Sequence, residues 1–277
     1  MATILVTGTS KGIGFETALA FARAGHTVFA TMRNPAGAPQ LAEIAASEGL
    51  PVAISQMDVD SDESVRDGMA AILAKGPLDV LVNNAGVEAV GSVEEQPLER
   101  FRAIMETNFF GVVRCVQAVV AQMRQRRSGC IINVSSVAGR FSAPPFASYC
   151  ASKWALEAMS EALAGEMKTF DVRVALVEPG IIDTAMAQRI GTPVADSPYR
   201  QGARYATLFA GSLQRPVPPS LVAEKIFDVF RSGTWQLRHL VGPDAVPMTE
   251  NRKTMTDEEW VALNGADDAT FFTAMGM

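Results

Sequence analysis

The sequence predicts an α/β protein whose parallel sheet is covered by helices on both faces. Short apolar runs that fit buried strands alternate with amphipathic stretches that fit helices along almost the whole chain. A glycine-rich turn follows the first apolar run directly and leads into the first helix. The 277 residues are enough for one large unit with a full core. Strands and helices that alternate at this spacing form parallel sheets with helices on both sides.

The expected elements follow one another in regular pairs. Strands are predicted at 3–7, 27–31, 52–57, 79–82, 130–134, 172–177 and 239–241. Helices are predicted at 15–24, 40–48, 63–74, 98–126, 147–170 and 219–231. We expect a single domain over residues 1–277, because no internal repeat or low-complexity linker divides the chain. Ligands of such sheets bind beyond the carboxyl ends of the strands.

The turn after the first strand has the composition of a phosphate-binding loop. Gly8 permits a tight turn, Gly12 lets the backbone approach a diphosphate, and Gly14 lets the helix pack close to the sheet. Free N–H groups at the helix N-terminus favour a bound anion. The spacing G-x-x-x-G-x-G differs from the commonest dinucleotide fingerprint, so glycines that only make a turn remain an alternative.

Composition excludes several classes of protein. A net charge of −6 and a pI near 5.1 argue against nucleic-acid binding and against an anionic membrane surface. No run approaches the roughly 18 apolar residues of a membrane span, and a strand that begins at residue 3 leaves no room for a signal peptide. Cys115, Cys130 and Cys150 lack metal-ligand spacing and predict reduced core thiols, and His26 and His239 are expected to be structural. We therefore expect a cytoplasmic protein without a metal site.

Tyr149 and Lys153 are the strongest catalytic candidates. Four residues apart on a helix, they share one face, with Cβ atoms roughly 5–6 Å apart. A cation beside a phenol stabilises the phenolate and lowers the tyrosine pKa, which suits proton transfer to or from an alcohol oxygen. By itself the pair also fits the surface of an amphipathic helix. Ser136 precedes Tyr149 by thirteen residues.

Together the motifs resemble those of the short-chain dehydrogenase/reductase family. The matching positions, in order, are Thr7-Gly8-x-x-x-Gly12-x-Gly14, Asn83-Asn84-Ala85-Gly86, Asn108, Ser136, Tyr149-x-x-x-Lys153 and Pro179-Gly180. The resemblance covers about residues 1–242 and extends, around Tyr149 and Arg33, to the hydroxysteroid and retinol reductase branch. It implies a doubly wound, Rossmann-like sheet of about seven strands and NAD(P)-dependent interconversion of an alcohol and a carbonyl.

The resemblance also implies a role for each catalytic candidate. Tyr149 would be the general acid or base, and Lys153 would lower its pKa and hold the nicotinamide ribose. Ser136, rather than Ser135, would hydrogen-bond the substrate oxygen. Asn108 would link Lys153 to a proton relay through a water, although a local bond within its helix is the alternative.

Cofactor contacts are expected along the same edge of the sheet. The predicted residues are Gly8, Ser10, Lys11, Gly12, Ile13, Gly14, Arg33, Asp58, Val59, Asn84, Ala85, Gly86, Tyr149, Lys153, Pro179, Gly180, Ile182 and Thr184. The second strand ends without a carboxylate to take a ribose 2′-hydroxyl, and Arg33 follows closely. Arg33 and Lys11 offer positive charge to a 2′-phosphate, so we expect NADP(H) to be preferred over NAD(H). Ordinary solvated surface charges are the alternative.

The substrate pocket is expected to be apolar. Its walls would come from residues 87–96, 140–146 and the long insertion 181–218, which is rich in aromatic and aliphatic side chains and suits a lid. This predicts a hydrophobic carbonyl or alcohol as small-molecule substrate, and the resemblance to the hydroxysteroid and retinol reductase branch implies a bulky ketone or aldehyde. Residues 243–277 lie outside the family core and could cover the pocket mouth, form a subunit interface or be disordered.

Partners and other functions follow from the same resemblance. The helices at 98–126 and 147–170 are those through which the family forms homodimers or homotetramers. A non-catalytic NADP-binding sensor would usually lack part of the Tyr, Lys and Ser set. A halohydrin-dehalogenase-like lyase would carry Arg in place of Lys153 and would lose the glycine loop.

Overall fold

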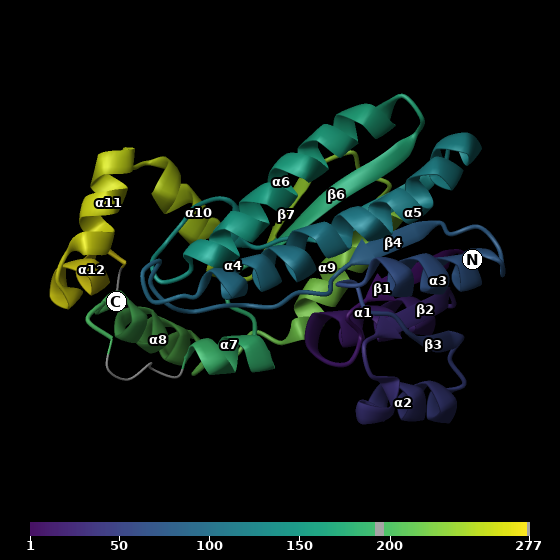
Figure 1. The fold of residues 1–277 in the computed structure, drawn as a ribbon, viewed down its shortest axis with the longest axis horizontal. Coiled ribbons are helices and arrows are strands. Elements are labelled where there is room, and N and C mark those ends of the chain that lie inside the picture. Colours follow the sequence, from purple (N-terminus) through teal and green to yellow (C-terminus); the bar gives the residue numbers. More distant parts are fainter. Residues whose placement is uncertain (192–196, 276–277) are drawn as a thin grey trace.

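The computed structural model describes residues 1–191 and 197–275, and its centre is a seven-stranded parallel sheet (Figure 1). The strand order is β3-β2-β1-β4-β5-β6-β7. The second and third strands therefore lie on one side of β1, and all later strands lie on the other side, beginning with β4. The strands are β1 (Thr3–Thr7), β2 (Thr27–Met32), β3 (Val52–Gln56), β4 (Val80–Asn83), β5 (Gly129–Val134), β6 (Val172–Pro179) and β7 (Arg238–Val241). The predicted doubly wound sheet is confirmed.

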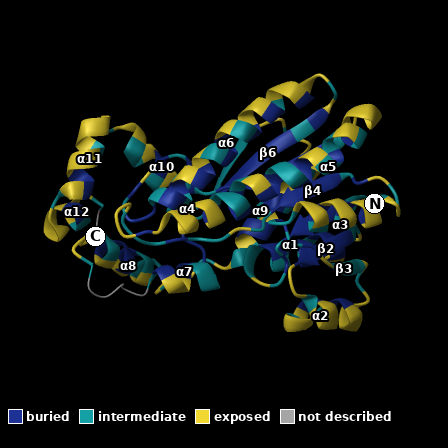
Figure 2. Cartoon of the chain, viewed as in Figure 1, coloured by how far each residue is buried: buried dark blue, intermediate teal, exposed yellow. Residues whose placement is uncertain are grey.

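Helices cover both faces of this sheet. One face packs on α1 (Gly12–Arg23), α2 (Gln40–Glu48) and α9 (Pro219–Ser232). The other face packs on α3 (Asp62–Leu73), α5 (Gly111–Arg126) and α6 (Ala147–Lys168), and α4 (Leu98–Met105) lies against α6. Buried residues concentrate on the strands, whereas these helices carry both buried and exposed residues (Figure 2).

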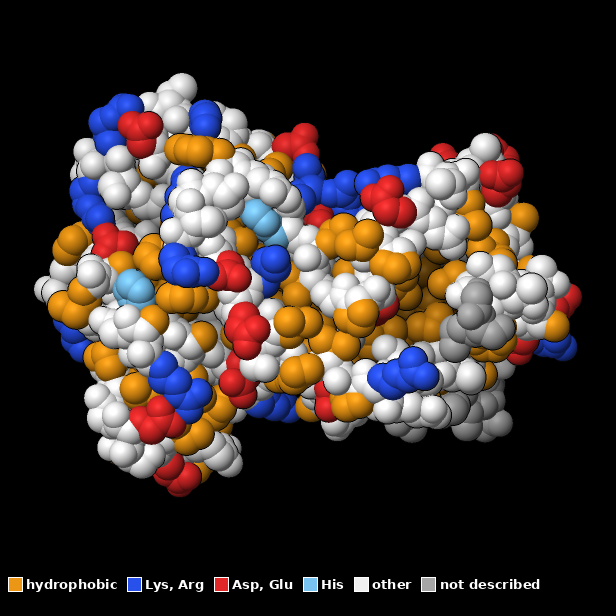
Figure 3. Space-filling model, turned by 180° about the vertical axis from the view of Figure 1, so that it is seen from behind, with side chains coloured by type: hydrophobic (Ala, Val, Ile, Leu, Met, Phe, Trp, Pro, Cys, Tyr) orange, Lys and Arg blue, Asp and Glu red, His pale blue; other side chains and the backbone are white. Residues whose placement is uncertain are grey.

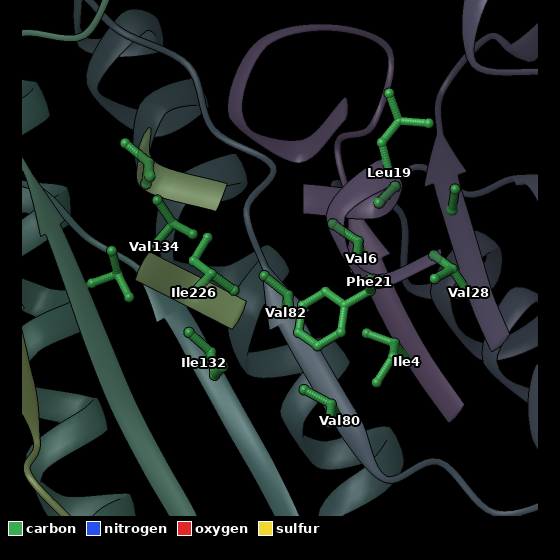
Figure 4. Close-up of a cluster of buried hydrophobic side chains, with 14 of the residues drawn as sticks. Ile4, Val6, Leu19, Phe21, Val28, Val80, Val82, Ile132, Val134 and Ile226 are labelled. Carbon is green, nitrogen blue, oxygen red and sulfur yellow. The ribbon is translucent and has the colours of Figure 1, made fainter. Parts of the chain in front are cut away.

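Two separate hydrophobic clusters result from the period-two alternation of each strand. Ile4 and Val6 point toward α1 and α9, whereas Leu5 between them points toward α3 and α5. The first cluster is drawn in Figure 4, where Phe21 of α1 and Ile226 of α9 meet the strand side chains. All three cysteines are free and buried, as expected of core thiols.

The region predicted as one helix over 98–126 is interrupted. A π-helical segment, Glu106–Phe110, separates α4 from α5, and the Gly111 N–H donates to the Glu106 carbonyl. Its extra residue per turn changes the direction in which Asn108 points. By length and composition alone the helical stretch Leu98–Arg126 is long and apolar enough to cross a membrane, because an 18-residue window within it has a mean hydropathy of 1.3. In the structure it packs against the sheet, α3 and α6.

Smaller differences concern where elements begin. Helix α1 begins at Gly12, three residues before the predicted start, so the last two glycines of the loop belong to its first turn. Strand β6 extends to Pro179, two residues beyond its predicted end. Both differences place the strand-to-helix turns directly at the edge of the sheet.

Helices that the sequence did not predict form a cover over one end of the sheet. The insertion contains α7 (Ala185–Ile190) and α8 (Gln201–Ser212), and the last part of the chain contains α10 (Ala245–Lys253), α11 (Asp257–Gly265) and α12 (Asp268–Ala274). We call these five helices the cover. Figure 1 shows α12 close to α8, and Arg204 of α8 bonds to Asp268 of α12 across 64 residues of sequence. Of the three options for residues 243–277, the described part, up to residue 275, is ordered and lies over this end.

Candidate active site

A cavity of about 1010 Å³ lies beyond the carboxyl ends of the strands. Residues that follow β1, β2, β3, β4, β5 and β6 all contribute to its wall. This is the location expected of a ligand site in an open parallel sheet. The cavity continues under the cover, where it is lined by residues of α7, α8 and α10.

The glycine loop closes one end of the cavity with its backbone. Gly8 has a φ of +72°, and a Cβ atom there would lie 2.7 Å from the Ala85 Cα. A Cβ on Gly14 would lie 2.3 Å from the Asn84 amide nitrogen, so α1 approaches the sheet as closely as predicted. Side chains at either position would displace the loop from the end of β4.

Asn84 joins the glycine loop to the end of β4. Its side-chain amide donates to the Thr7 carbonyl at 2.9 Å and to the Gly8 carbonyl at 3.1 Å. The Thr7 hydroxyl accepts in return from the Asn84 and Ala85 N–H groups. These bonds hold the two strand ends together and keep the cavity floor rigid.

The charged groups at this end differ in their surroundings. Lys11 and Arg33 are exposed and line the cavity, and within the described residues neither makes an ion pair. Asp58 also lines it and accepts from the Asp60 N–H. Asp60 is half-buried, accepts from the Thr107 hydroxyl at 3.0 Å and has a pKa raised mainly by burial. Two cations are therefore available to a ligand at this rim.

Tyr149, Lys153 and Ser136 meet in the middle of the cavity. The Lys153 ammonium lies 5.7 Å from the centre of the Tyr149 ring and donates to the Val134 carbonyl at 2.9 Å. The Ser136 hydroxyl lies next to Tyr149 and also accepts from the Ala138 N–H. Ser135, the alternative serine, has a buried hydroxyl that forms no hydrogen bond in the described structure.

Burial dominates the pKa values of this pair. Burial raises the pKa of Tyr149 to about 12, and the Ser136 hydroxyl opposes that shift. Burial lowers the pKa of Lys153 to about 8, and the negative charge of Glu157 opposes this. Burial thus outweighs the groups that lower the pKa of Tyr149, and the effect of Lys153 on that pKa stays a prediction.

Asn108 lies behind the cavity wall rather than in it. Its side-chain oxygen accepts from the Val87 N–H at 2.8 Å, and its amide donates to the Val87 carbonyl and to the Ser152 hydroxyl. The side chain thus ties the π-helical segment to the loop after β4 and to α6. The bonds reach other elements, unlike the local bond considered from sequence, and the water relay to Lys153 remains a prediction.

The turn after β6 forms the opposite wall. Pro179, Gly180, Ile182 and Thr184 all line the cavity. The Thr184 hydroxyl caps α7 by accepting from the Ala187 N–H.

Sequence reasoning missed Asp244, at the start of the C-terminal extension. Its carboxylate accepts from the Ile181 N–H at 2.7 Å and fills the space beside Gly180. No local pattern around Asp244 indicates this contact, because its partner lies 63 residues away.

The structure brings nearly all of the predicted site residues into one cavity. Those that line it are Gly8, Ser10, Lys11, Gly12, Ile13, Arg33, Asp58, Val59, Asn84, Ala85, Gly86, Ser136, Tyr149, Lys153, Pro179, Gly180, Ile182 and Thr184. Gly14 and Asn108 do not line the cavity and lie behind its wall.

Glu88 was not singled out from the sequence, although it belongs to the predicted segment 87–96. It lines the cavity, pairs with Arg189 of α7 at 2.7 Å and adds negative charge near Tyr149.

The part of the cavity beyond Tyr149 is apolar. Phe146, Cys150, Tyr205, Phe209 and Met248 line it and belong to one hydrophobic cluster with the buried Phe271 of α12. Hydrophobic side chains surround a hollow on the face shown in Figure 3. Such a surface favours a largely apolar ligand.

Comparisons with known proteins agree with this geometry. The family model described as short chain dehydrogenase matches residues 2–195. Retinol dehydrogenase 8 of Bos taurus is 43% identical over 66% of this chain and 59% of its own length, and estradiol 17-beta-dehydrogenase 1 of Rattus norvegicus is 32% identical over 90% and 76%. A short-chain dehydrogenase structure from Streptomyces avermitilis matches with a TM-score of 0.82 and 34% identity over 96% of this chain and 98% of that one. Among further solved structures with this fold, one was determined with NADPH and another with NAD.

Proposed function

The chain belongs to the short-chain dehydrogenase family, whose members act on alcohol and carbonyl groups, and we propose that it is an NADP(H)-dependent oxidoreductase with Tyr149 as its general acid and base. The observation that carries this proposal is the position of Tyr149 and Lys153 in one cavity with the glycine loop. A surface pair on an amphipathic helix would not line such a cavity.

The residues present fit a dinucleotide. Gly8 leaves no space for a side chain against Ala85, so the main chain itself is the surface on which a diphosphate would lie. Asp58 and Val59 line the cavity at the end of β3 and would hold the adenine end, and Lys153 and Thr184 would hold the nicotinamide end. The dinucleotide would supply or accept the hydride.

The remaining chemistry is proton transfer by side chains of this chain. With its pKa raised to about 12, Tyr149 is protonated at neutral pH and can give its proton to a carbonyl oxygen. The Ser136 hydroxyl, next to Tyr149, would hold that oxygen in place. A Lys153 ammonium near the ring stabilises the phenolate that forms when the proton leaves. In the oxidative direction the same groups act in reverse.

Cofactor choice rests on Arg33 and Lys11, the two exposed cations at the cavity rim. A guanidinium can bind a 2′-phosphate through two hydrogen bonds, and a charge-assisted bond contributes on the order of 1.5–3 kcal/mol. We expect Arg33→Ala to weaken NADPH binding about tenfold or more and to leave NADH binding nearly unchanged. Titration of both reduced cofactors by fluorescence measures this ratio, with the exposed Arg231→Ala on α9 as a matched control. Equal weakening for both cofactors, or a wild-type preference for NADH, would refute the NADP(H) assignment.

The substrate is proposed to be a small molecule with a bulky hydrophobic part, which is a ketone, an aldehyde or an alcohol. The apolar wall around Phe146, Tyr205 and Phe209 supports this class, as do the names of the retinol and estradiol dehydrogenases among the relatives. A panel of carbonyls of increasing apolar size, assayed by loss of the NADPH absorbance band, tests the activity. Turnover that rises with apolar size supports the proposal, and binding of NADPH without turnover on any member would favour the non-catalytic sensor. The lyase alternative is disfavoured by Lys153 and by the glycine loop.

A homo-oligomer and a cytoplasmic location remain predictions. Phe110 of the π-helical segment and Trp154 of α6 are about half exposed, on the helices expected to form subunit contacts. These apolar side chains support self-association, which the molar mass in solution would measure.

A further inference from the structure

Helix α6 carries a second buried charge one turn beyond Lys153. Glu157 follows Lys153 by four residues, so the two side chains lie on the same face of the helix, and both residues are only 5% exposed. They make no direct ion pair within the part of the chain that the structure describes. Charges in a buried setting act over longer distances than charges in water, because the surroundings screen them less.

Glu157 belongs to a cluster with more acids than bases. Its carboxylate pairs with Arg238 of β7 at 2.9 Å. Arg238 also pairs with Glu161 of α6 at 2.6 Å and lies 3.8 Å from Glu178 of β6. Glu178 pairs in turn with Arg140 at 3.2 Å. Three carboxylates therefore share two guanidinium groups, and the cluster has an excess of negative charge when all of its members are ionised.

One oxygen of Glu157 has no hydrogen-bond partner. Its Oε1 atom is buried, and the Ser135 Oγ atom is buried and unpartnered as well. A Cβ on Gly139 would lie 3.3 Å from that Oε1 and 3.0 Å from that Oγ, so the two polar atoms converge on Gly139. Ser135 lines the active-site cavity. The Glu157 oxygen that has no hydrogen-bond partner is therefore next to the cavity wall.

We propose that Glu157 is a positioning residue that keeps Lys153 in its ammonium form. Burial of Lys153 works in the opposite direction and brings its pKa to about 8, close enough to neutrality for a neighbouring charge to decide the protonation state. Within the described residues, the other charged or titratable groups around this region include Tyr149 and Cys150 of α6, Glu88 of the loop after β4 and the members of the cluster. Glu178 has a pKa of about 7, raised by burial and then by Glu157, so the negative charge of the cluster increases as the pH rises through neutrality.

The direct test is the protonation state of Lys153, which needs no substrate. Trace labelling of the enzyme with acetic anhydride over a pH series, followed by mass spectrometry of the Lys153 peptide, gives the midpoint at which the amine becomes reactive. In Glu157→Gln this midpoint should move to lower pH by about half a unit or more, because the ammonium loses its supporting charge. If the substitution instead opened the structure around Lys153, the midpoint would move to higher pH, because water would reach the amine and stabilise the ammonium. A midpoint that stays or rises in a folded variant overturns the proposal.

Two further variants complete the test. Glu161→Gln removes an exposed carboxylate from the same arginine and should leave the Lys153 midpoint unchanged; a shift equal to that of Glu157→Gln would overturn the specific role of Glu157. Arg238→Gln removes the positive charge that opposes Glu157 and should raise the midpoint. If Glu157→Gln does not fold, an unchanged or lower midpoint in Arg238→Gln overturns the proposal.

The consequence for catalysis rests on the proposed function. If Lys153 must be an ammonium for turnover, the alkaline limb of the kcat/KM profile in Glu157→Gln should move to lower pH in parallel with the labelling midpoint. The two failures are distinguishable. A midpoint that moves in a protein without carbonyl turnover refutes the oxidoreductase function alone, and turnover with an unmoved midpoint refutes the role of Glu157 alone.

Discussion

The edge of the sheet and the cover over it are built in different ways. At the edge, residues that follow successive strands lie together because parallel strands end on the same side. Backbone groups and small residues predominate there, as in the contact of Gly8 with Ala85. The cover is instead held by side chains from distant parts of the sequence, such as the 2.8 Å ion pair between Arg204 of α8 and Asp268 of α12.

Because of this difference, the groups proposed for the chemical step and the groups proposed to select the substrate lie in different parts of the molecule. The groups proposed to move a proton and hold a dinucleotide belong almost entirely to the edge, whose geometry follows from the fold. The apolar wall that would select a substrate belongs largely to the cover. A substitution in the edge should therefore change the rate of the chemical step or cofactor binding, and one in the cover should change mainly the affinity for substrate.

The largest effect is expected at the edge, from Tyr149→Phe. Loss of a general acid typically lowers kcat by about 10²- to 10⁴-fold. The ring that packs in the cavity remains, so the Kd for NADPH should change little. Steady-state kinetics with NADPH and a hydrophobic carbonyl, together with fluorescence titration of the cofactor, measure both quantities.

Tyr199→Phe is the matched control, because Tyr199 lies between α7 and α8, is exposed and donates a hydrogen bond from its hydroxyl to the Glu94 carboxylate. It should retain nearly the wild-type kcat. If Tyr149→Phe keeps more than about a tenth of the wild-type kcat, another group supplies the proton.

A smaller effect is expected in the cover, from Arg204→Met. The Arg204 guanidinium is almost fully buried and donates to the Asn264 carbonyl at 3.1 Å and to the Ala266 carbonyl at 2.5 Å. Without these bonds, buried carbonyl groups lose their donors, at a cost of about 1–3 kcal/mol in the free energy of unfolding. The KM for a hydrophobic carbonyl should rise, whereas the Kd for NADPH should not.

Denaturant unfolding and cofactor titration of Arg204→Met provide the measurement, with the exposed Arg215→Met as control. An equal loss of affinity for NADPH and for substrate would show that the edge and the cover are not separable. That outcome would also remove the main reason to assign substrate choice to the cover.

The same contrast explains what could be predicted from the sequence. Local sequence patterns specify a strand, the turn that follows it and the next helix. They therefore predict the strands, the turns that contain Gly8 and Ser136, and the helix that contains Tyr149. They do not predict the pKa of Tyr149, because burial in a cavity depends on side chains from the whole fold. The order of the C-terminal helices likewise depends on buried partners such as Arg204, which local composition does not reveal.

The π-helical segment at Glu106–Phe110 is an intermediate case. The apolar periodicity of residues 98–126 predicts a helix, and a helix is present on both sides of the interruption. The inserted residue is specified by contacts of Asn108 with Val87 and Ser152, which lie on other elements. Periodicity within one helix does not contain that information.

The smallest effect is expected where cover and edge meet, from Arg189→Gln. Arg189 of α7 pairs with Glu88 at 2.7 Å, but the arginine side chain is 59% exposed. Pairs this open contribute about 1 kcal/mol or less and weaken in salt. We therefore expect the KM for a hydrophobic carbonyl to rise by less than about fivefold, with kcat nearly unchanged.

Ionic strength gives this last prediction its control. High salt should raise the wild-type KM toward that of Arg189→Gln and should leave the variant almost unaffected, since the variant has no ion pair to screen. A KM that rises far more than this, or that does not respond to salt, would mean that Arg189 contacts the substrate itself. Helix α7, which joins the edge to the cover, would then be part of the substrate site. The residues for the chemical step and the residues that select the substrate would then no longer be separate at α7.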